Sequence, residues 1–177
     1  MRKLSMAELN RLSPAQFNEA PKLPLVVVLD DIRSLNNIGS FFRTADAFRI
    51  QAIYLCGITA TPPHRDIHKT ALGATESVEW QYFNKVEDAL NNLKLQGYQI
   101  ISIEQTTQSI PLSKLKIEKP VALVFGNEVD GVSDAALQQS DLAVEIPQLG
   151  TKHSLNVAVC GGIVIWHCFN QLSISFD

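Results

Sequence analysis

Two glycines and a serine bracket a short loop whose spacing is close to that of a phosphate-binding loop. The stretch Gly126-Asn-Glu-Val-Asp-Gly131-Val132-Ser133 departs from the pattern G-x-x-x-x-G-K-S/T at the lysine, where Val132 stands. Without this lysine the loop lacks the main cation for β- and γ-phosphates, which argues against nucleotide hydrolysis. The glycines still indicate that a ligand approaches the backbone at Gly126 and that Gly131 occupies a turn with positive φ. An ordinary strand-to-helix turn is the alternative.

A second polar segment combines carboxylates, amides and guanidinium groups. It reads Asp30-Asp31-Ile-Arg33-Ser-Leu-Asn36-Asn37-Ile-Gly39-Ser-Phe-Phe-Arg43-Thr44. Asn37 is placed to cap a helix, and Gly39 allows close approach near the positive end of that helix. Arg43 follows Asn37 by about 600° of helical rotation, so the two side chains need not point in the same direction. Asp30 and Asp31 form either an acid pair or, as we favour, solvated or capping carboxylates.

A third polar segment reads Ile146-Pro147-Gln148-Leu149-Gly150-Thr151-Lys152-His153-Ser154-Leu155-Asn156-Val157. Ser154 is a plausible cap for the apolar helix that follows, and Asn156 lies in its first turn. Polar side chains at the start of a helix either accept hydrogen bonds from backbone donors or face a ligand, and both interpretations stay open.

Two further patterns are weaker. His64 and His68 have the spacing of a metal-binding pair on a helix, but no third ligand is obvious, so we expect no metal. The pattern G-x-G-x-x-G does not occur, so a Rossmann-type nucleotide site is not supported.

The composition favours a single globular domain. The chain has 177 residues, of which 46% are hydrophobic, which suits one sizeable core and excludes a disordered chain. We expect neither a membrane span nor a secretory leader, because no apolar run reaches the roughly 18 residues that a membrane span requires. Three cysteines cannot all pair, which favours a reduced, cytoplasmic protein. The net charge is −3, but residues 1–71 hold nine Lys and Arg against six Asp and Glu, which permits a local anion-binding face.

Strands alternate with helices from residue 25 onward. The expected strands are 25–29, 52–56, 78–83, 98–103, 121–125 and 142–146, and the expected helices are 6–12, 37–48, 66–72, 86–95, 133–139 and 155–172. Prolines at 14, 21 and 24 predict an irregular lead-in, and residues 106–119 are expected to be mostly loop. The alternation predicts an α/β domain with a mostly parallel sheet and helices on both faces. Ligands bind beyond the C-terminal strand ends of such sheets, where all three polar segments begin.

Taken together and in their order along the chain, the three segments resemble the motifs of the SpoU (TrmH-like) RNA 2′-O-ribose methyltransferases of the SPOUT superfamily. The matching positions are Asn37-x-Gly39-x-x-x-Arg43-Thr44, Leu123-Val-Phe-Gly126-Asn-Glu128-x-x-Gly131-Val-Ser133 and Ile146-Pro147-x-x-Gly150-x-x-x-Ser154-Leu155-Asn156-Val157. The resemblance covers residues 24–170 and implies a parallel sheet whose C-terminal part is threaded into a trefoil knot. It divides the chain into an N-terminal helical lead-in, residues 1–24, and a single SpoU-type methyltransferase domain, residues 25–177.

The resemblance implies methyl transfer from S-adenosylmethionine to a ribose 2′-hydroxyl of RNA. Gly126, Ile146 and Leu155 are expected to line the donor pocket. The expected catalytic residues are Arg43, Asn37, Ser154, Asn156 and Glu128. A guanidinium stays protonated in proteins, so we expect Arg43 to hold an RNA phosphate and stabilise developing oxyanion charge rather than act as a base.

The other four catalytic candidates are expected to orient these groups. Asn37 would position the ribose or Arg43, and Glu128 would brace its loop or Asn156. Ser154 and Asn156 would orient the substrate at the donor. The first motif along the chain, Asn37-x-Gly39-x-x-x-Arg43-Thr44, also carries Phe41 and Phe42 where relatives usually have smaller aliphatic residues. We interpret this difference as a core substitution.

The resemblance also implies a homodimer with its active site near the interface, where Arg43 would serve the partner's cofactor. The expected RNA is tRNA rather than rRNA, because only some 24 residues precede the first expected strand, where many relatives carry an RNA-binding domain. The alternative is a catalytically inactive RNA-binding protein that retains the knotted fold, and the low net charge favours it.

Overall fold

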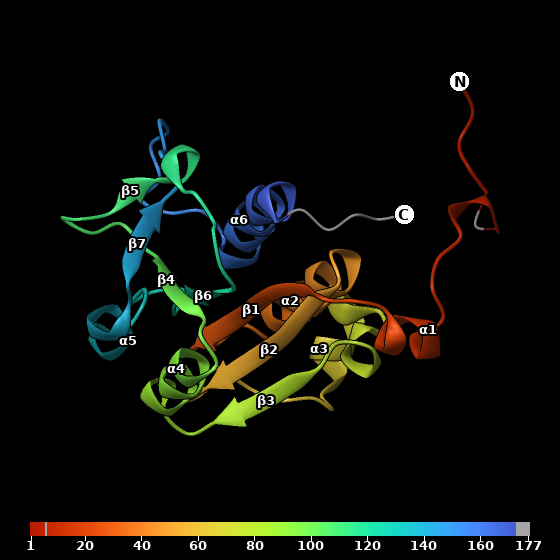
Figure 1. The fold of residues 1–177 in the computed structure, drawn as a ribbon, viewed down its shortest axis with the longest axis horizontal. Coiled ribbons are helices and arrows are strands. Elements are labelled where there is room, and N and C mark those ends of the chain that lie inside the picture. The colour runs from red at the N-terminus through yellow and green to blue at the C-terminus, as the bar shows by residue number, and fades with distance from the viewer. Residues whose placement is uncertain (6, 173–177) are drawn as a thin grey trace.

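The computed structural model describes residues 1–5 and 7–172 (Figure 1). Its strands are β1 (Leu23–Asp30), β2 (Ile50–Cys56), β3 (Trp80–Phe83), β4 (Gln99–Ile103), β5 (Ile110–Pro111), β6 (Val121–Phe125) and β7 (Leu142–Glu145). They form one sheet in the order β3-β2-β1-β6-β4-β7-β5, and every pairing between these strands is parallel. In the central pair, Val27 of β1 is opposite Leu123 of β6. The predicted parallel α/β sheet is confirmed.

The helices cover both faces of the sheet. They are α1 (Pro14–Glu19), α2 (Leu35–Ala47), α3 (Arg65–Ala71), α4 (Val86–Leu95), α5 (Asp134–Gln139) and α6 (Val157–Gln171), with short 3₁₀ turns at Ala7–Leu9, Ala74–Glu76 and Leu112–Lys114. Val27 faces a core that α1, α2, α3 and α6 cover, whereas Val28 faces a core under α4 and α5. This is why β1 and β6 read as continuous apolar runs rather than as alternating patterns. The helices α1 and α5 lie at opposite ends of the molecule (Figure 1).

The two phenylalanines of the first motif along the chain belong to the core, as expected. Phe41 and Phe42 are buried, and the Phe41 ring lies 5.0 Å, between centroids, from the ring of Phe125 at the end of β6. A side chain at Gly161 of α6 would overlap the Phe41 ring. Phe41 therefore packs α2 against both β6 and α6.

The prediction of a helix over residues 6–12 was wrong. Only one 3₁₀ turn forms, at Ala7–Leu9, and residue 6 lies outside the described residues. Local hydrogen bonds do form, since the Ser5 N–H and hydroxyl each donate to a Glu8 carboxylate oxygen at 2.8 Å. The turn buries no residue, however, and a short helix needs packing to persist.

The lead-in predicted as irregular contains α1, because Pro14 begins this helix rather than breaking one. Ser13 and Gln16 form a reciprocal capping box, and Phe17 is the buried residue of the helix. Proline is favoured in the first helical turn, where its missing N–H costs no hydrogen bond. The edge strand β5 and a 3₁₀ turn likewise lie within the segment expected to be mostly loop. The end of the predicted domain, residues 173–177, lies outside the described residues.

Among the described residues, no helix is both long and apolar enough to span a lipid bilayer.

Candidate functional site

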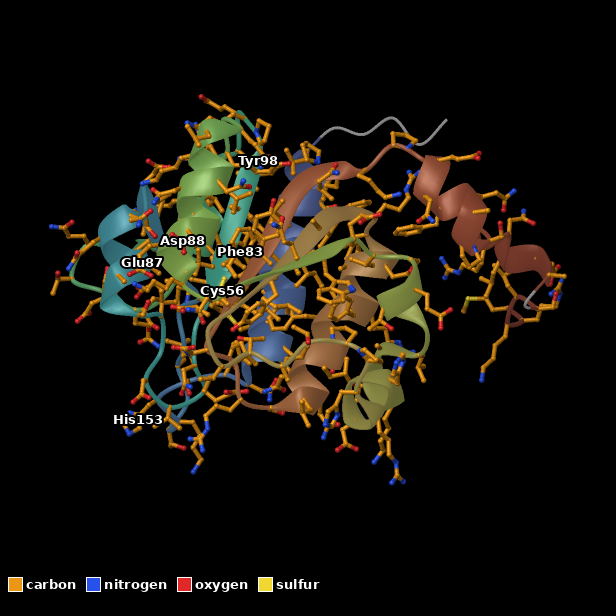
Figure 2. All side chains as sticks on the ribbon, turned by 90° about the horizontal axis from the view of Figure 1, so that it is seen from below. Cys56, Phe83, Glu87, Asp88, Tyr98 and His153 are labelled. Carbon is orange, nitrogen blue, oxygen red and sulfur yellow. The ribbon has the colours of Figure 1, made fainter. Side chains whose placement is uncertain are left out.

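A cavity of about 830 Å³ lies at the C-terminal edge of the sheet. Its walls come from the loops that follow β4, β6 and β7, together with the first turns of α6. All three predicted donor-site residues line it, namely Gly126, Ile146 and Leu155. His153 also lines it, on the loop after β7, at the end of the molecule away from the N-terminal segment (Figure 2).

Glu128 connects the second polar segment to the loop after β6. Its carboxylate accepts hydrogen bonds from the backbone N–H groups of Arg33 and Ser34, both at 3.0 Å, and from Asn37 Nδ2 at 2.8 Å. Partial burial raises the pKa of Glu128, but these hydrogen bonds outweigh burial and hold the pKa below its usual value. Three donors therefore stabilise the charged form of the Glu128 carboxylate.

Asn37 extends this chain of hydrogen bonds to the third segment. Its Oδ1 accepts a hydrogen bond from Asn156 Nδ2 at 3.1 Å, while its own Nδ2 donates to Glu128. Glu128, Asn37 and Asn156 thus form one continuous network beside the cavity. The three motifs, far apart in sequence, meet through these three side chains.

Both expected helix caps are wrong in detail. Ser34, not Asn37, caps α2, because its hydroxyl accepts from the Asn37 N–H at 3.3 Å. Asn156, not Ser154, caps α6, because its Oδ1 accepts from the N–H groups of Ala158 and Val159 at 3.0 and 3.2 Å. Ser154 is exposed and lines the cavity. Ser133 caps α5, because its hydroxyl accepts from the Ala136 N–H at 3.2 Å.

The absence of a side chain at Gly126 makes room for its own loop. A Cβ at Gly126 would overlap the backbone of Gly131 and Val132. Gly131 has the expected positive φ, at +74°. Gly39 likewise accommodates α3, since a Cβ there would overlap Thr70 and the Ile67 carbonyl oxygen. Both glycines permit close packing of protein backbone.

Replacing Gly126 by alanine is expected to destabilise the fold by about 1–3 kcal/mol, because the added methyl group must displace loop backbone. Urea denaturation measures this change. Gly150→Ala is the matched control, since a Cβ there meets nothing within 4 Å. Equal stability of the two variants would contradict the overlap.

Asp30 and Asp31 brace loops. Asp30 is 3% exposed, so it is not solvated, and it accepts from the N–H of Ser133, the cap of α5, at 3.0 Å. Of the two favoured roles, solvated or capping, the structure fits the capping one for this residue. Burial raises the pKa of Asp30. Asp31 Oδ1 accepts from the Ile58 N–H at 2.8 Å, which ties the loop after β1 to the loop after β2.

The loop after β4 supplies cavity residues that the motifs did not indicate. Glu104 Oε2 accepts from the Val132 N–H at 3.0 Å, and Gln105 Nε2 donates to the His153 carbonyl oxygen at 3.1 Å. Both residues line the cavity. Their position directly after a parallel strand was the signal that could have found them.

Arg43 does not line this cavity. It is exposed on α2 and lines a second cavity, which the N-terminal segment and the turn after α3 help to form. Within one chain, Glu128, Asn156 and Ser154 therefore line the first cavity, and Asn37 is hydrogen-bonded to the first two of them. Arg43 lies outside this cavity.

His64 and the three cysteines have structural explanations. His64 Nδ1 caps α3 by accepting from the Asp66 N–H at 3.2 Å, and no three His, Cys, Asp or Glu side chains of the described residues could together hold a metal ion. All three cysteines are free thiols. Burial raises the pKa of Cys160 to about 11 and that of Cys168 to about 12, and Cys56 lies deep beside Phe83 near α4 (Figure 2). Their thiolates are therefore scarce at neutral pH.

The chain is similar to known proteins over most of its length. It is 32% identical over 151 residues to a 23S rRNA (guanosine-2′-O-)-methyltransferase RlmB from Nitrosomonas europaea, covering 84% of this chain and 57% of the relative. Across this relative and two others, a second RlmB and an uncharacterized tRNA/rRNA methyltransferase, the chain spans 56–65% of their length.

Two solved structures share the fold. The TrmH/SpoU tRNA modifying enzyme of Aquifex aeolicus matches with a TM-score of 0.79 at 25% identity, over 89% of this chain and 81% of that enzyme. An AdoMet-bound rRNA methyltransferase from Sinorhizobium meliloti matches with a TM-score of 0.80 at 26% identity, over 93% of this chain and 62% of that one. The family model of the SpoU rRNA methylases matches residues 24–166. The chain therefore belongs to the SpoU rRNA methylase family.

Proposed function

We propose that this protein is an S-adenosylmethionine-dependent RNA methyltransferase that modifies a ribose 2′-hydroxyl. The observation that carries the proposal is the network of Glu128, Asn37 and Asn156, which joins the three family motifs beside a cavity. The family membership and the AdoMet-bound relative support the same activity.

The first cavity suits the donor in size and chemistry. Its volume of about 830 Å³ lies within the usual range of ligand pockets. Ile146 and Leu155 offer apolar surface for a purine ring, and Glu104 adds a carboxylate for polar groups. We propose that Gly126, Ile146 and Leu155 hold the donor. When bound, S-adenosylmethionine supplies an electrophilic methyl group whose transfer leaves a neutral thioether.

The side chains divide between chemistry and positioning. Glu128 is a poor base because three donors already engage its carboxylate. Asn37 and Asn156 are also engaged, so we propose all three as positioning residues that fix the loops around the donor. Arg43 is proposed to hold an RNA phosphate and stabilise the charge that develops on the hydroxyl oxygen. The exposed Ser154 hydroxyl is proposed to orient the acceptor.

We propose that the active protein is a homodimer in which Arg43 serves the partner's donor site. One face of α6 exposes Val159, Ile163 and Trp166, by 55%, 42% and 52%. An apolar face of this kind is typical of an interface. Arg43 lies outside its own donor cavity, which supports a site completed by the second subunit.

We also propose the trefoil knot, with residues 1–24 as lead-in and 25–177 as one methyltransferase domain. Family membership supports the knot. The helix that would belong to the knot, α6, contacts two distant segments: Gln171 Nε2 donates to the Leu115 carbonyl oxygen and Gln171 Oε1 accepts from the Ile117 N–H, while Gly161 packs on Phe41.

We propose tRNA as the preferred substrate and the cytoplasm as the location. Enzymes that act on either RNA match the chain, and in sequence a tRNA (guanosine(18)-2′-O)-methyltransferase of Aquifex aeolicus matches over 69% of its own length and RlmB over 57%. Three free cysteines support a reducing compartment.

The protein is incubated with labelled donor and either unmodified tRNA or unmodified rRNA, and the digested RNA is analysed by mass spectrometry. We expect a 2′-O-methylated nucleoside from the tRNA. The donor alone should stabilise the fold by about 2.7 kcal/mol at a concentration of 100 times its Kd. Methylation of a base would contradict the proposed acceptor. Donor binding without product from either RNA would favour the inactive RNA-binding alternative.

A further inference from the structure

A second cavity, of about 990 Å³, lies away from the donor site. It is enclosed by the N-terminal segment around Arg11 and α1, the C-terminal half of α2 and the turn between α3 and the following 3₁₀ helix. These elements lie at the α1 end of the molecule (Figure 1). The only described residue that is proposed to act in catalysis and also lines this cavity is Arg43.

The cavity is rich in guanidinium groups. Arg11, Arg43 and Arg49 line it, from three different parts of the chain, against the carboxylates of Asp46 and Glu76. Asp46 Oδ1 accepts a hydrogen bond from the Ser77 hydroxyl at 2.7 Å. Nearby, burial and the charge of Arg49 both lower the pKa of Lys22, although Glu79 opposes this. The cationic surplus of this region favours an anionic ligand.

The cavity also has an apolar wall, which a small free anion would not need. Leu12 and Leu72 line it over the buried ring of Phe17. Leu72 is 66% exposed and lies in the left-handed region, with φ at 50°, at the end of α3. Exposed apolar surface beside arginines suits a nucleotide, because the base packs on the wall while the phosphate meets the cations. The N–H groups of a base would donate to Asp46 or Glu76.

We propose that this cavity binds one nucleotide of the acceptor RNA, with its phosphate on Arg11 and Arg49 and its base against Leu12 and Leu72. The inference rests on the proposed function, because it places the RNA where Arg43 is exposed. It adds that the N-terminal segment is part of the RNA-binding surface. It also gives this protein, whose net charge is −3, a local surface that attracts phosphate.

The charge half of the proposal is tested with Arg11→Ala and Arg49→Gln in the full chain, binding fluorescent tRNA at several salt concentrations. Each variant is expected to bind tRNA about tenfold more weakly, since a hydrogen bond to a charged group is lost. The slope of log Kd against log salt should fall by about 0.7–0.9 for each lost phosphate contact. Arg65→Ala is the matched control, because Arg65 is exposed but does not line the cavity.

The apolar half is tested with Leu72→Asn, because asparagine tolerates the left-handed backbone. This variant should weaken tRNA binding without changing the salt slope. Ile58→Asn is its control, since Ile58 is equally exposed and lines neither cavity. Thermal unfolding and calorimetric titration with S-adenosylmethionine should give wild-type values for Arg11→Ala and Leu72→Asn.

The proposal would be overturned if Arg11→Ala bound tRNA with wild-type affinity and salt slope and if Leu72→Asn bound tRNA as tightly as Ile58→Asn. Binding of free guanosine monophosphate that depends on Arg11, with tRNA binding unaffected, would also overturn it by assigning the cavity to free nucleotides. If the wild-type protein methylates no RNA but these variants still lose tRNA affinity, the proposed function fails and the binding site stands.

Discussion

Alanine at position 43 is expected to reduce methyl transfer to RNA by at least about 100-fold, which is the usual effect of removing a group that stabilises transition-state charge. The loss should leave the fold intact, because Arg43 is exposed on α2 and the core contacts of this helix come from Phe41 and Phe42. Donor binding should also be unchanged, because Arg43 is proposed to contact the RNA phosphate and the acceptor oxygen rather than the donor. Single-turnover methylation of tRNA with saturating donor measures the rate, and calorimetry measures donor affinity.

Arg43→Lys separates charge from geometry. Lysine keeps the positive charge but loses the planar fork that binds phosphate through two parallel hydrogen bonds. We therefore expect its rate to lie between those of the wild type and Arg43→Ala. Full activity of Arg43→Ala on the true substrate would contradict the assignment of Arg43, whatever the lysine variant does.

The sheet could be predicted from the sequence because its strands leave little ambiguity. The runs 25–29 and 121–125 are apolar on both faces, and only a central parallel strand requires this. The structure of the N-terminal lead-in was harder to predict, because a proline such as Pro14 has opposite effects on a helix at different positions. It breaks a helix from within but favours one from its first turn, and the burial of Phe17 decides between them.

The motifs indicated the three side chains of the hydrogen-bond network, Glu128, Asn37 and Asn156, but not the contacts between them. Ser34 and Asn37 are both acceptable caps for α2, and local sequence does not rank them. The choice follows from Glu128, 91 residues away from Asn37, which occupies the Asn37 amide. The same holds for Asn156, whose Nδ2 reaches Asn37 across 119 residues of sequence. Long-range pairing of this kind has no periodic pattern in the chain.

Two inactive variants are expected to restore activity when they form a mixed dimer, if Arg43 serves the partner's donor site. One subunit carries Arg43→Ala. The other carries Leu155→Arg, which fills the donor cavity from a position that is 37% exposed and therefore buries little charge. In the mixed dimer, one site combines an intact donor cavity with an intact Arg43 from the opposite subunit. The other site lacks both.

A mixed dimer purified through two different tags should therefore have about half the activity of the wild-type dimer, because a two-fold symmetric dimer has two equivalent sites. Each variant alone should be nearly inactive in the same methylation assay. Pairing Arg43→Ala with the double variant Arg43→Ala/Leu155→Arg is the control, and it should recover nothing, since neither of its sites holds both parts. If the first pair also recovers nothing, Arg43 acts within its own subunit. The second cavity would then hold RNA for the donor site of the same chain, and the exposed face of α6 would need another explanation.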